Sequence, residues 1–472
     1  MAAVIGVDSS TQSCKLVVVD VESGAVLQRA VASHPDGTEV DPEAWWRALQ
    51  ECLEQVDTSD VQAIAIGAQQ HGLVALGAGG EVVRPALLWN DTRSAPQAEA
   101  LIEQFGADEL AQRTGSVPVA SFTSTKLAWM RQHEPELAER VAAVALPHDW
   151  LGWRLRGFGP DGQSRLGPDL EQLVTDRSDA SGTGYFSPVS NSYDDDILTG
   201  ALGHRPVVPR VIGPGESAGT TEQGWILGAG GGDNAMAALG LDAQVGDVVM
   251  SLGTSGTVFA RTSSPAVDPT GTIAGFADAS GGFLPLGATL NASRSIDSVR
   301  GLLGLSWDEF STAVRRAAPG SGGLTMLPFF DGERMPNLPD ATGTLGGITR
   351  ANLTPDNLAR ASVEAVLANL SRGIDVVSSM TEQLTRVLLI GGAAQNDGVQ
   401  QVAADTVPLP VVVPEPDEYV ALGAAKQAAW ALTGSCPDWA PQAQSLDASS
   451  ASDAARIQFE ALLGQVHRSG RN

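Results

Sequence analysis

The feature that most constrains the fold is a strand–turn–strand pattern that occurs near the start of the chain and again near its middle. The first copy has apolar runs at 4–7 and 16–19 on either side of a turn rich in hydroxyl side chains. The second has apolar runs at 248–250 and 258–260 around another turn of Ser, Gly and Thr. Such a repeat favours two similar α/β domains that face each other and present both turns to a shared cleft. On shape alone, two unrelated hairpins remain the alternative.

The length of 472 residues supports this division, because one hydrophobic core rarely serves so long a chain. The stretch 183–223 is rich in Gly, Pro, Ser and Asp, which predicts irregular structure leading to a domain boundary near 222–225. We therefore predict an N-terminal domain over 1–223, a second domain over 224–432, and a C-terminal tail and helix over 433–472.

Hydrophobic periodicity predicts further elements in both halves. Strands are expected at 21–31, 61–66, 387–390 and 409–413, and helices at 42–56, 98–105, 126–132 and 454–466. The segment 421–432 is a helix of small residues, which predicts close packing against a neighbouring element.

The acidic composition excludes some partners. The net charge is −26 and the pI is near 4.5, which argues against binding to nucleic acid or to an anionic membrane surface. A nucleotide ligand is still compatible, because a Gly-rich loop and one bound cation can form a local anion site. The three cysteines show no metal-ligand spacing, and the first residues lack a signal-peptide pattern, so we expect a cytoplasmic protein.

Two acidic residues follow patterns that suit phosphoryl transfer. Asp8 comes directly after an apolar strand and opens a turn of hydroxyl side chains, with Lys15 just beyond it. A carboxylate there could hold a metal ion, and the turn could bind phosphate oxygens. The alternative is an ordinary hairpin turn in which Asp and Ser make local hydrogen bonds.

Asp233 lies between the glycines 230–232 and an Ala-rich helix, at the position expected for an N-cap. A plain helix cap is one interpretation. The other is a general base, which the helix N-terminus would keep ionised at neutral pH.

Two further Gly-containing segments are candidates for nucleotide contacts. The turn 251–257 could bind phosphate, although it is not a P-loop because no Gly-Lys-Ser/Thr follows. The segment 391–394 follows a buried strand, where α/β folds bind ligands, but it lacks the dinucleotide-binding fingerprint.

Two polar segments of the first half are candidates for binding a polyhydroxylated ligand. One is 69–72, which contains Gln70 and His71, and the other is 88–93, which contains Trp89, Asn90 and Asp91. Together they offer hydrogen-bond donors, acceptors and an apolar wall. Taken singly, His71 and Trp89 are better explained as core or loop residues.

Taken in order, these segments resemble the FGGY family of carbohydrate kinases over nearly the whole chain. The Gln-Gln-His-Gly segment at 69–72, the Trp-Asn-Asp-Thr-Arg segment at 89–93 and the Gly-Gly-Gly-Asp-Asn loop at 230–234 match motifs on its sugar side. Three further segments match other family motifs: Thr-Asp-Arg-Ser-Asp-Ala-Ser-Gly-Thr at 175–183, 251–257 and Gly-Glu-Arg-Met-Pro at 332–336. Segments 387–393 and 419–425 match its adenosine-side motifs.

The resemblance implies two actin-like, ribonuclease-H-like ATPase domains around a central cleft that holds ATP and Mg²⁺. It assigns the sugar to the first domain and the nucleotide to the second, with Asp233 as the base on the sugar hydroxyl and Asp8 as the metal ligand. The implied sugar contacts are Gln70, His71, Trp89, Asn90, Asp91 and Asp233. The implied nucleotide contacts are Thr11, Lys15, Gly253, Thr254, Gly391, Gly392 and Asn396.

The implied substrate is a ketose, and the loop with His71 favours D-xylulose over ribulose, gluconate or a polyol. An actin-like ATPase without a sugar pocket and a relative that only binds sugar are the other readings. The segment 391–396 reads Gly-Gly-Ala-Ala-Gln-Asn where many relatives have Gly-Gly-Gly-Ala-Lys/Arg-Ser. Because this segment is implied to contact the adenosine, the departure could weaken a strict preference for ATP. A homodimer is compatible with the resemblance, since dimers are frequent in the family.

Overall fold

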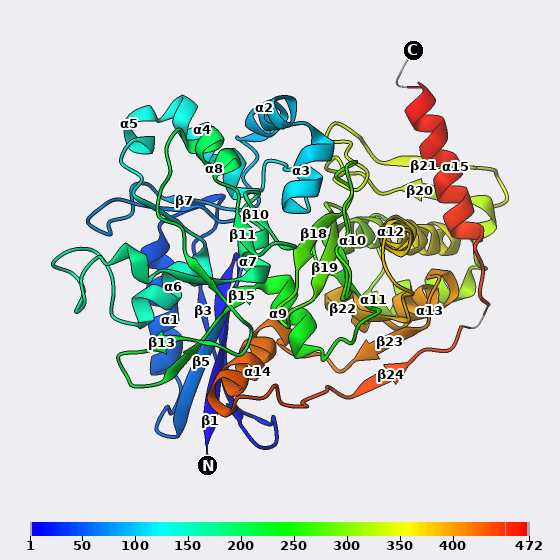
Figure 1. Ribbon diagram of the computed structural model, residues 1–472. Helices are drawn as coiled ribbons and strands as arrows, with labels where there is room; N and C mark the ends of the chain where they lie inside the picture. The colour runs from blue at the N-terminus through cyan, green and yellow to red at the C-terminus, as the bar shows by residue number, and fades with distance from the viewer. Residues whose placement is uncertain (1, 449, 470–472) are drawn as a thin grey trace. The chain divides into compact units, whose positions relative to one another are not determined.

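The computed structural model describes residues 2–448 and 450–469, and the chain divides into two compact units. The first unit runs to Ala243 and also includes Pro265–Leu284 and Asp417–Pro441. The second consists of Gln244–Ser264, Pro285–Pro416 and the chain from Gln442 onward. Each unit contains a mixed β-sheet with helices packed against it (Figure 1), which confirms the predicted two-domain α/β fold.

The sheet of the first unit is built around β1, whose residues are all buried. β2 and β3 extend it on one side as an antiparallel meander, while β5 and β14 lie parallel to β1 on the other. Short β15 pairs with the end of β5, and β13 forms the edge beyond β14. The strands are β1 (Ala3–Ser9), β2 (Ser13–Asp20), β3 (Val26–Ser33), β5 (Val61–Ala68), β13 (Ser217–Thr220), β14 (Ile226–Gly228) and β15 (Gly231–Gly232).

Helices and short strand pairs complete the first unit. The helices are α1 (Pro42–Glu54), α2 (Ala95–Phe105), α3 (Ala107–Thr114), α4 (Thr123–His133), α5 (Pro135–Ala138), α6 (Pro147–Leu155), α7 (Arg177–Ser181), α8 (Asp195–Leu202), α9 (Asp233–Gly240) and α14 (Tyr419–Thr433). The short strands are β4 (Glu39–Val40), β6 (Val74–Leu76), β7 (Ala86–Leu87), β8 (Ala143–Ala145), β9 (Val174–Asp176), β10 (Phe186–Ser187), β11 (Ser192–Tyr193) and β12 (Arg210–Ile212). Strand β18 (Ala274–Ala277) lies in the segment Pro265–Leu284 and pairs with β19 in the other seven-stranded sheet.

The sheet of the second unit repeats the topology of the first. β16 pairs antiparallel with β17, which pairs antiparallel with β19, and β22 and β23 follow parallel to β16 on its other side. The strands are β16 (Asp247–Leu252), β17 (Gly256–Ala260), β19 (Phe283–Thr289), β22 (Arg386–Ile390), β23 (Val411–Pro414) and β24 (Ala443–Ser445). The order β3-β2-β1-β5-β14 thus corresponds to β19-β17-β16-β22-β23, as expected for a duplicated domain.

The second unit is completed by one long helix and several shorter ones. They are α10 (Ser293–Leu302), α11 (Trp307–Arg316), α12 (Pro355–Ser378), α13 (Asp397–Thr406) and α15 (Ala454–Ser469), together with the strand pair β20 (Thr325–Leu327) and β21 (Thr344–Gly346). α12 packs against β17 and against α10, α11, α13 and α15. Among the helices described, none has both the length and the apolar composition that crossing a membrane requires.

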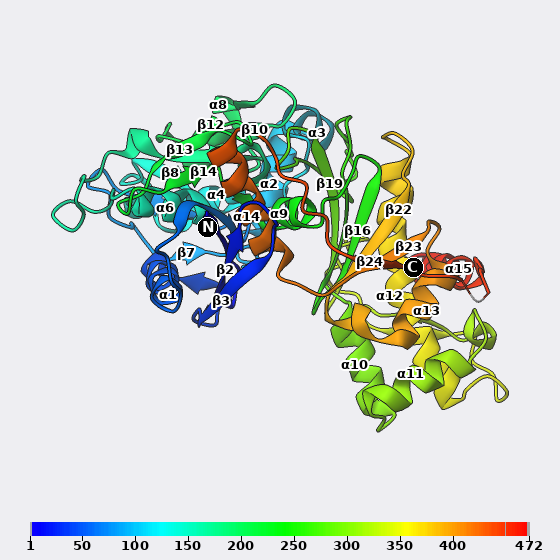
Figure 2. The ribbon, with the colours of Figure 1, turned by 90° about the horizontal axis from the view of Figure 1, so that it is seen from below.

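Helix α14 packs in the first unit, although it comes late in the chain (Figures 1 and 2). It contacts β1, β5 and α9 at very short range. A Cβ on Gly6 would lie 1.8 Å from the carbonyl oxygen of Ala421, and a Cβ on Gly423 would lie 1.9 Å from that of Met236. Only glycine fits at these two positions, which explains the small-residue composition from which close packing was predicted.

The contact-defined units do not follow the boundaries drawn from composition. Strand β14 lies beyond the boundary placed after residue 223, yet it belongs to the sheet of β1 and β5. The predicted tail beginning at 433 is also divided, because its first residues belong with α14. The Gly- and Pro-rich stretch 183–223, expected to be irregular, contains α8 and four short strands, because its apolar residues reach the core through tertiary contacts.

Candidate active site

Three parallel strands of the first unit bring the predicted sugar-side and catalytic residues to one edge of the sheet. In the β1–β5 register Asp8 lies beside Gly67, and in the β5–β15 register Gly231 also lies beside Gly67. Since the carboxyl ends of parallel strands meet at one edge, Asp8, Gln70 and Asp233 all follow or end strands there. The structure therefore brings Asp8, the segment of Gln70 and the loop before Asp233 to the same edge of the sheet.

Asp8 lies near the end of β1 and is only 6 % exposed. Its Oδ1 is buried and has no hydrogen-bond partner among the described residues. Burial, together with the nearby charge of Asp233, raises the pKa of Asp8 to about 7, although Lys15 acts to lower it. A buried, unpaired carboxylate oxygen with this electrostatic strain is a site where a cation would be favourable.

Asp233 is the first residue of α9, and its position corrects the cap interpretation. The N-cap is Gly232, and no side chain caps the helix there. Asp233 Oδ1 instead accepts two hydrogen bonds from Asn234, from the backbone N–H and from Nδ2, each at 2.7 Å. The carboxylate is thus bound to the next residue, Asn234, and does not act as the N-cap of α9.

The pKa of Asp233 also differs from our expectation. Desolvation raises it from 3.8 to about 6, although the two hydrogen bonds from Asn234 act in the opposite direction. The helix N-terminus was expected to favour the charged form, but the loss of water outweighs that effect. A pKa of about 6 still leaves the group mainly ionised at neutral pH, and it brings the group close to the value that suits a general base.

The sugar-loop candidates Gln70 and His71 are both held by the segment that contains α7. Gln70 Nε2 donates to the carbonyl of Ser178 at 2.6 Å, and His71 Nδ1 lies 2.6 Å from the carbonyl oxygen of Gly182. His71 has a left-handed backbone with φ of 72°, which is uncommon for a residue with a side chain. Such a conformation persists only where the surroundings enforce it, and it is frequent at ligand sites.

Two aromatic rings that the sequence analysis did not identify as site residues lie beside the ring of His71. Its ring centroid lies 4.8 Å from that of Phe122 and 5.7 Å from that of Phe276. Phe276 lies in β18, within the segment Pro265–Leu284 that joins the first unit from the second half of the chain. No local signal in the sequence connects this phenylalanine with His71, because only the tertiary path of the chain brings them together.

The cluster around Trp89 is partly structural. Trp89 Nε1 donates to the hydroxyl of Thr11 at 2.8 Å, so a predicted sugar contact and a predicted nucleotide contact bind each other. Asp91 accepts from Thr38 and from Arg93, and these hydrogen bonds lower its pKa against the effect of burial. Asn90 Oδ1 is buried and has no partner in the part of the chain that the structure describes.

Two buried side chains beside Asp8 add polar groups that our selection missed. Ser9 Oγ and both polar side-chain atoms of Gln69 are buried and lack hydrogen-bond partners within residues 2–448 and 450–469. The backbone N–H of Gln69 donates to the carbonyl of Ser9 at 3.1 Å, so the two residues are neighbours. Gln69 was within the segment that we named, and its side chain could have been included on the same reasoning as that of Gln70.

Lys15 lies opposite Asp8 in the β1–β2 pair. Its Nζ forms an ion pair with Glu418 at 2.7 Å, and more than a third of each side chain is exposed. Such a half-exposed pair contributes little to stability, since water screens it. Breaking the Lys15–Glu418 ion pair would therefore cost little free energy, so Lys15 could bind a phosphate group instead.

The nucleotide candidates of the second unit lie around the β16–β17 turn. Gly391 has φ of 97°, and a Cβ there would lie 2.6 Å from the carbonyl carbon of Leu252, at the end of β16. The Gly391 segment thus packs directly against the turn that contains Gly253 and Thr254. A Cβ on Gly392 would meet nothing within 4 Å, so the space beside this glycine is open.

Asn396 has a structural role in this unit. It is the N-cap of α13, and its Oδ1 accepts from the N–H groups of Gly398 at 2.9 Å and of Val399 at 3.2 Å. Its Nδ2 donates to the carbonyl of Trp307 at 3.4 Å, and its assignment as a nucleotide contact stays a prediction. The segment 419–425, selected as an adenosine-side motif, forms the start of α14 in the first unit.

The donor set of the first unit suits a hard divalent cation, which prefers oxygen ligands. Asp8 supplies an unpaired carboxylate oxygen, and Ser9 a buried hydroxyl beside it. In the second unit the open space at Gly392 and the exposed turn at Thr254 suit a bulky, anionic ligand. A carboxylate with oxygen donors in the first unit and an anion-binding turn in the second are kinds of group that phosphoryl transfer requires.

Both halves of the chain match models of one protein family. Residues 3–242 match the N-terminal domain, and residues 248–432 the C-terminal domain, of the FGGY family of carbohydrate kinases. Together the two models cover most of the chain. They divide it between 242 and 248, which is also where the first unit's long N-terminal segment ends.

Individual relatives agree with this match. The chain is 46% identical over 447 residues to a xylulose kinase of Streptomyces coelicolor, covering 91% of this chain and 88% of that protein. It is 47% identical over 451 residues to a xylulose kinase of Streptomyces rubiginosus, covering 92% and 89%. The crystal structure of a xylulose kinase from Bifidobacterium adolescentis superposes with a TM-score of 0.91 at 43% identity, covering 98% and 99%.

Proposed function

The chain belongs to the FGGY family of carbohydrate kinases, and on this premise we propose that it transfers the γ-phosphoryl group of ATP to a hydroxyl group of D-xylulose. The choice of D-xylulose is supported by relatives named xylulose kinase that share nearly half of their residues with almost the whole chain. The observation that carries the chemistry is the desolvated carboxylate of Asp233 at the sheet edge, beside Gln70 and within the Gly-rich loop.

In the proposed reaction Asp233 accepts the proton of the sugar hydroxyl. The sugar oxygen forms a bond to the γ-phosphorus, and the bond from that phosphorus to the bridging oxygen of ATP breaks, which leaves ADP. Because the pKa of Asp233 is about 6, the carboxylate is available as a base at neutral pH. General-base catalysis of this kind contributes about a hundredfold to ten-thousandfold.

Asp8 would hold the Mg²⁺ ion that accompanies ATP, with Ser9 as a neighbouring oxygen donor. When bound, the ion supplies positive charge that stabilises the phosphate oxygens. Gln70, His71 and the cluster of Trp89, Asn90 and Asp91 would orient the sugar. For the nucleotide, Gly253, Thr254, Gly391 and Gly392 of the second unit and Thr11 and Lys15 of the first are the proposed contacts. Cytoplasmic location and a homodimer remain part of the prediction.

The central test replaces Asp233 by Ala. We expect turnover in a coupled ADP-release assay with Mg·ATP and D-xylulose to fall at least a hundredfold, while calorimetric binding of the sugar changes little. Asp308→Ala is the matched control, because Asp308 is also an acidic first-turn residue but is exposed on α11. Comparable turnover in a folded Asp233→Ala variant would rule out the base assignment.

The substrate is tested separately with a panel of D-xylulose, D-ribulose, gluconate and polyols. We expect the highest kcat/KM with D-xylulose, because discrimination between hydroxyl patterns requires polar groups placed for one of them. A higher kcat/KM with another member of the panel would reassign the sugar within the family. ATP hydrolysis that no sugar stimulates would instead support an actin-like ATPase.

A further inference from the structure

A buried charged cluster lies beside the loop that leads to Asp233, and the proposed reaction does not use it. It consists of His148, Asp149, Asp176 and Asp179, and none of these side chains is more than 3 % exposed. His148 and Asp149 are in the first turn of α6, Asp176 ends β9, and Asp179 is in α7. Burying several ionisable groups is costly, so a cluster of this kind needs an explanation.

The ring of His148 is surrounded by acceptors. Its Nδ1 lies 2.5 Å from Asp179 Oδ2, and its Nε2 lies 3.2 Å from the carbonyl oxygen of Ala229. Nε2 also lies 3.3 Å from Asp149 Oδ1. A carbonyl can only accept, so Nε2 carries a hydrogen, and the nearby carboxylates favour a second proton on Nδ1.

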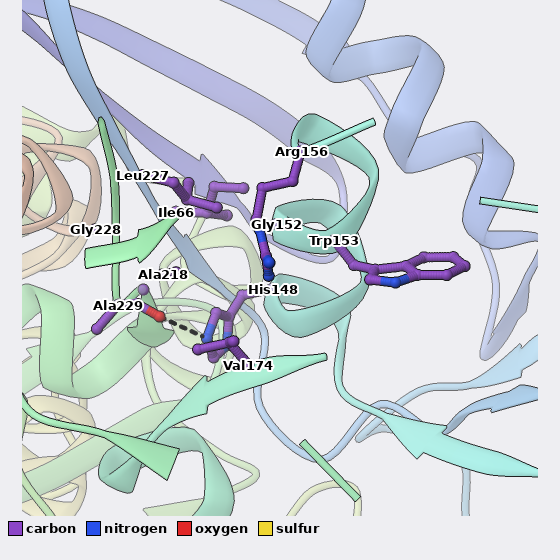
Figure 3. A pocket seen from close by; sticks show the side chains of 11 residues that line it. Ile66, His148, Gly152, Trp153, Arg156, Val174, Ala218, Leu227, Gly228 and Ala229 are labelled. Carbon is purple, nitrogen blue, oxygen red and sulfur yellow. Dashed lines mark hydrogen bonds between the residues drawn. The ribbon is translucent and has the colours of Figure 1, made fainter. Parts of the chain in front are cut away.

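The acidic neighbours favour a doubly protonated ring, although burial also raises the pKa of Asp179 itself, to about 7. Desolvation lowers the pKa of His148, but Asp149 and Asp179 raise it to about 10. The charged groups facing the ring are Asp149 of α6, Asp176 at the end of β9, Asp179 of α7, and Arg156 at the end of α6. Figure 3 shows Arg156 running along a cavity toward His148, although its guanidinium is bound to Gln172 at 2.7 Å.

The group that His148 contacts is the start of the Gly-rich loop. Ala229 precedes Gly230, and a Cβ on Gly230 would lie 2.3 Å from His148 Cδ2, so the ring packs directly on the loop. Gly230 is also bound through its N–H and its carbonyl by Gln427, at 2.7 and 3.0 Å. Asp233 is the third residue after this doubly held glycine and directly follows Gly232.

Helix α7 holds the other end of the loop. Gly232 N–H donates to Ser178 Oγ at 3.1 Å, while the carbonyl of Ser178 accepts from Gln70. Asp176 caps α7 by accepting from the N–H groups of Ser178 and Asp179, each at 2.9 Å. The His148–Asp179 pair therefore connects α6 to the short helix that positions both the catalytic loop and the sugar loop.

We propose that His148 is a positioning residue that, as an imidazolium held by Asp179, fixes the loop 229–232 and thereby the carboxylate of Asp233. This inference rests on the proposed role of Asp233 as base. This role for His148 also argues against a metal site in the cluster. His148, Asp149 and Asp179 offer ligand atoms within 4.8 Å of one another, as a metal site would, but both ring nitrogens are committed to Ala229 and Asp179.

The first experiment measures the protonation of His148 in the full chain without sugar or nucleotide. In ¹⁵N-detected spectra we expect the ring of His148 to remain doubly protonated from pH 6 to 9. Asp179→Asn should allow His148 to lose its proton within this range. A neutral His148 ring at pH 7 in the wild type would overturn the proposal.

The second experiment measures kinetics. We expect His148→Asn to lower kcat about 10- to 100-fold with a change in sugar KM of less than about threefold, because a small displacement of the base affects the transition state more than binding. His204→Asn is the control, since His204 also bonds one carbonyl, that of Val141, away from the loop. Unchanged kcat in a folded His148→Asn chain would contradict the proposal, and if this variant does not fold, the spectra of the wild type decide.

Metal analysis separates the two interpretations of the cluster. After dialysis against a chelator and reconstitution with Zn²⁺ or Mn²⁺, we expect the same metal content in the wild type and in Asp179→Asn. One equivalent of tightly bound metal that is lost in Asp179→Asn would make the cluster a metal site and overturn the imidazolium. If the wild type phosphorylates no sugar, the proposed function fails, whereas the spectra and metal content still test His148.

Discussion

Asp8 and Asp233 show how a reactive group is made from common side chains. In both, the loss of water at the edge of the sheet raises the pKa of the carboxyl group, and the charge of Asp233 raises the pKa of Asp8 as well. A chain selected only for stability would not keep two carboxylates there. The raised pKa values therefore indicate a functional compromise between stability and reactivity.

This compromise predicts that Asp233→Asn stabilises the protein above pH 6. The folded pKa of about 6 exceeds the unfolded value of 3.8, so the folded state binds more protons between these values, and stability falls as pH rises through them. Above pH 6 the charged Asp233 lowers the free energy of unfolding by at most about 3 kcal/mol, which corresponds to a pKa difference of about 2 units at 1.36 kcal/mol each. Thermal unfolding of both chains from pH 4 to 8 would show a difference that grows with pH, and a constant difference would contradict this account.

His71 makes a second prediction at this scale. Its backbone is left-handed, a conformation that Asn adopts readily and a β-branched residue does not. We expect His71→Asn to keep the melting temperature but to raise the sugar KM at least tenfold, because the ring between Phe122 and Phe276 is lost. His71→Val should in addition lose about 1–3 kcal/mol of stability. Equal melting temperatures for the two variants would show that the backbone is not strained.

At the scale of elements, α14 is the helix on which the first unit depends. It packs against β1, β5 and α9, and at Gly6 and Gly423 the backbones themselves approach closely. A surface of this kind has no room to adjust, because no rotamer change can relieve a clash between two backbones.

We therefore predict that Gly423→Ala, a change that normally strengthens a helix, destabilises this protein. Its new Cβ would lie 1.9 Å from the carbonyl oxygen of Met236, so α14 and α9 must move apart, at a cost of more than about 3 kcal/mol. Gly464→Ala in α15 is the control, since nothing lies within 4 Å of its Cβ, and it should be neutral or stabilise by up to about 1 kcal/mol. Chemical denaturation measures both, and similar free energies of unfolding would contradict the packing described.

At the scale of the whole molecule, the first unit is assembled from three separate segments of the chain. The segment Pro265–Leu284 supplies Phe276 to the surroundings of His71, and Asp417–Pro441 supplies α14. Folding of the first unit thus requires residues from both sequence halves. Its stability therefore depends on contacts between residues that are far apart in the sequence.

A fragment of residues 3–242 tests this dependence. It spans the residues that match the N-terminal family model, yet it lacks α14 and β18, so the face of β1 and β5 would be exposed. We expect no cooperative thermal unfolding from the fragment, and recovery of a cooperative transition when residues 417–441 are joined to it through a flexible linker. Cooperative unfolding of the fragment alone near the melting temperature of the full chain would show that the unit is independent.

Local patterns were sufficient for the central strands of both sheets and for the position of Asp8 after a strand, whereas the choice of Gln70 and Asp233 also rested on the resemblance to the family. A buried strand is visible as an apolar run, and a polar residue directly after it must lie at the edge of the sheet. The repeated strand–turn–strand pattern likewise predicted two domains of one topology, because the hydrogen bonding of a meander is decided by nearby residues.

What only the tertiary structure decided depends on atoms that are distant in sequence. Whether Asp233 caps α9 or turns toward Asn234 depends on the loop that His148, Gln427 and Ser178 hold. Whether its pKa rises or falls depends on how much water the surrounding chain excludes. The membership of α14 and Phe276 in the first unit follows from backbone contacts that no local pattern encodes, because close packing is a property of two surfaces and a sequence describes each of them separately.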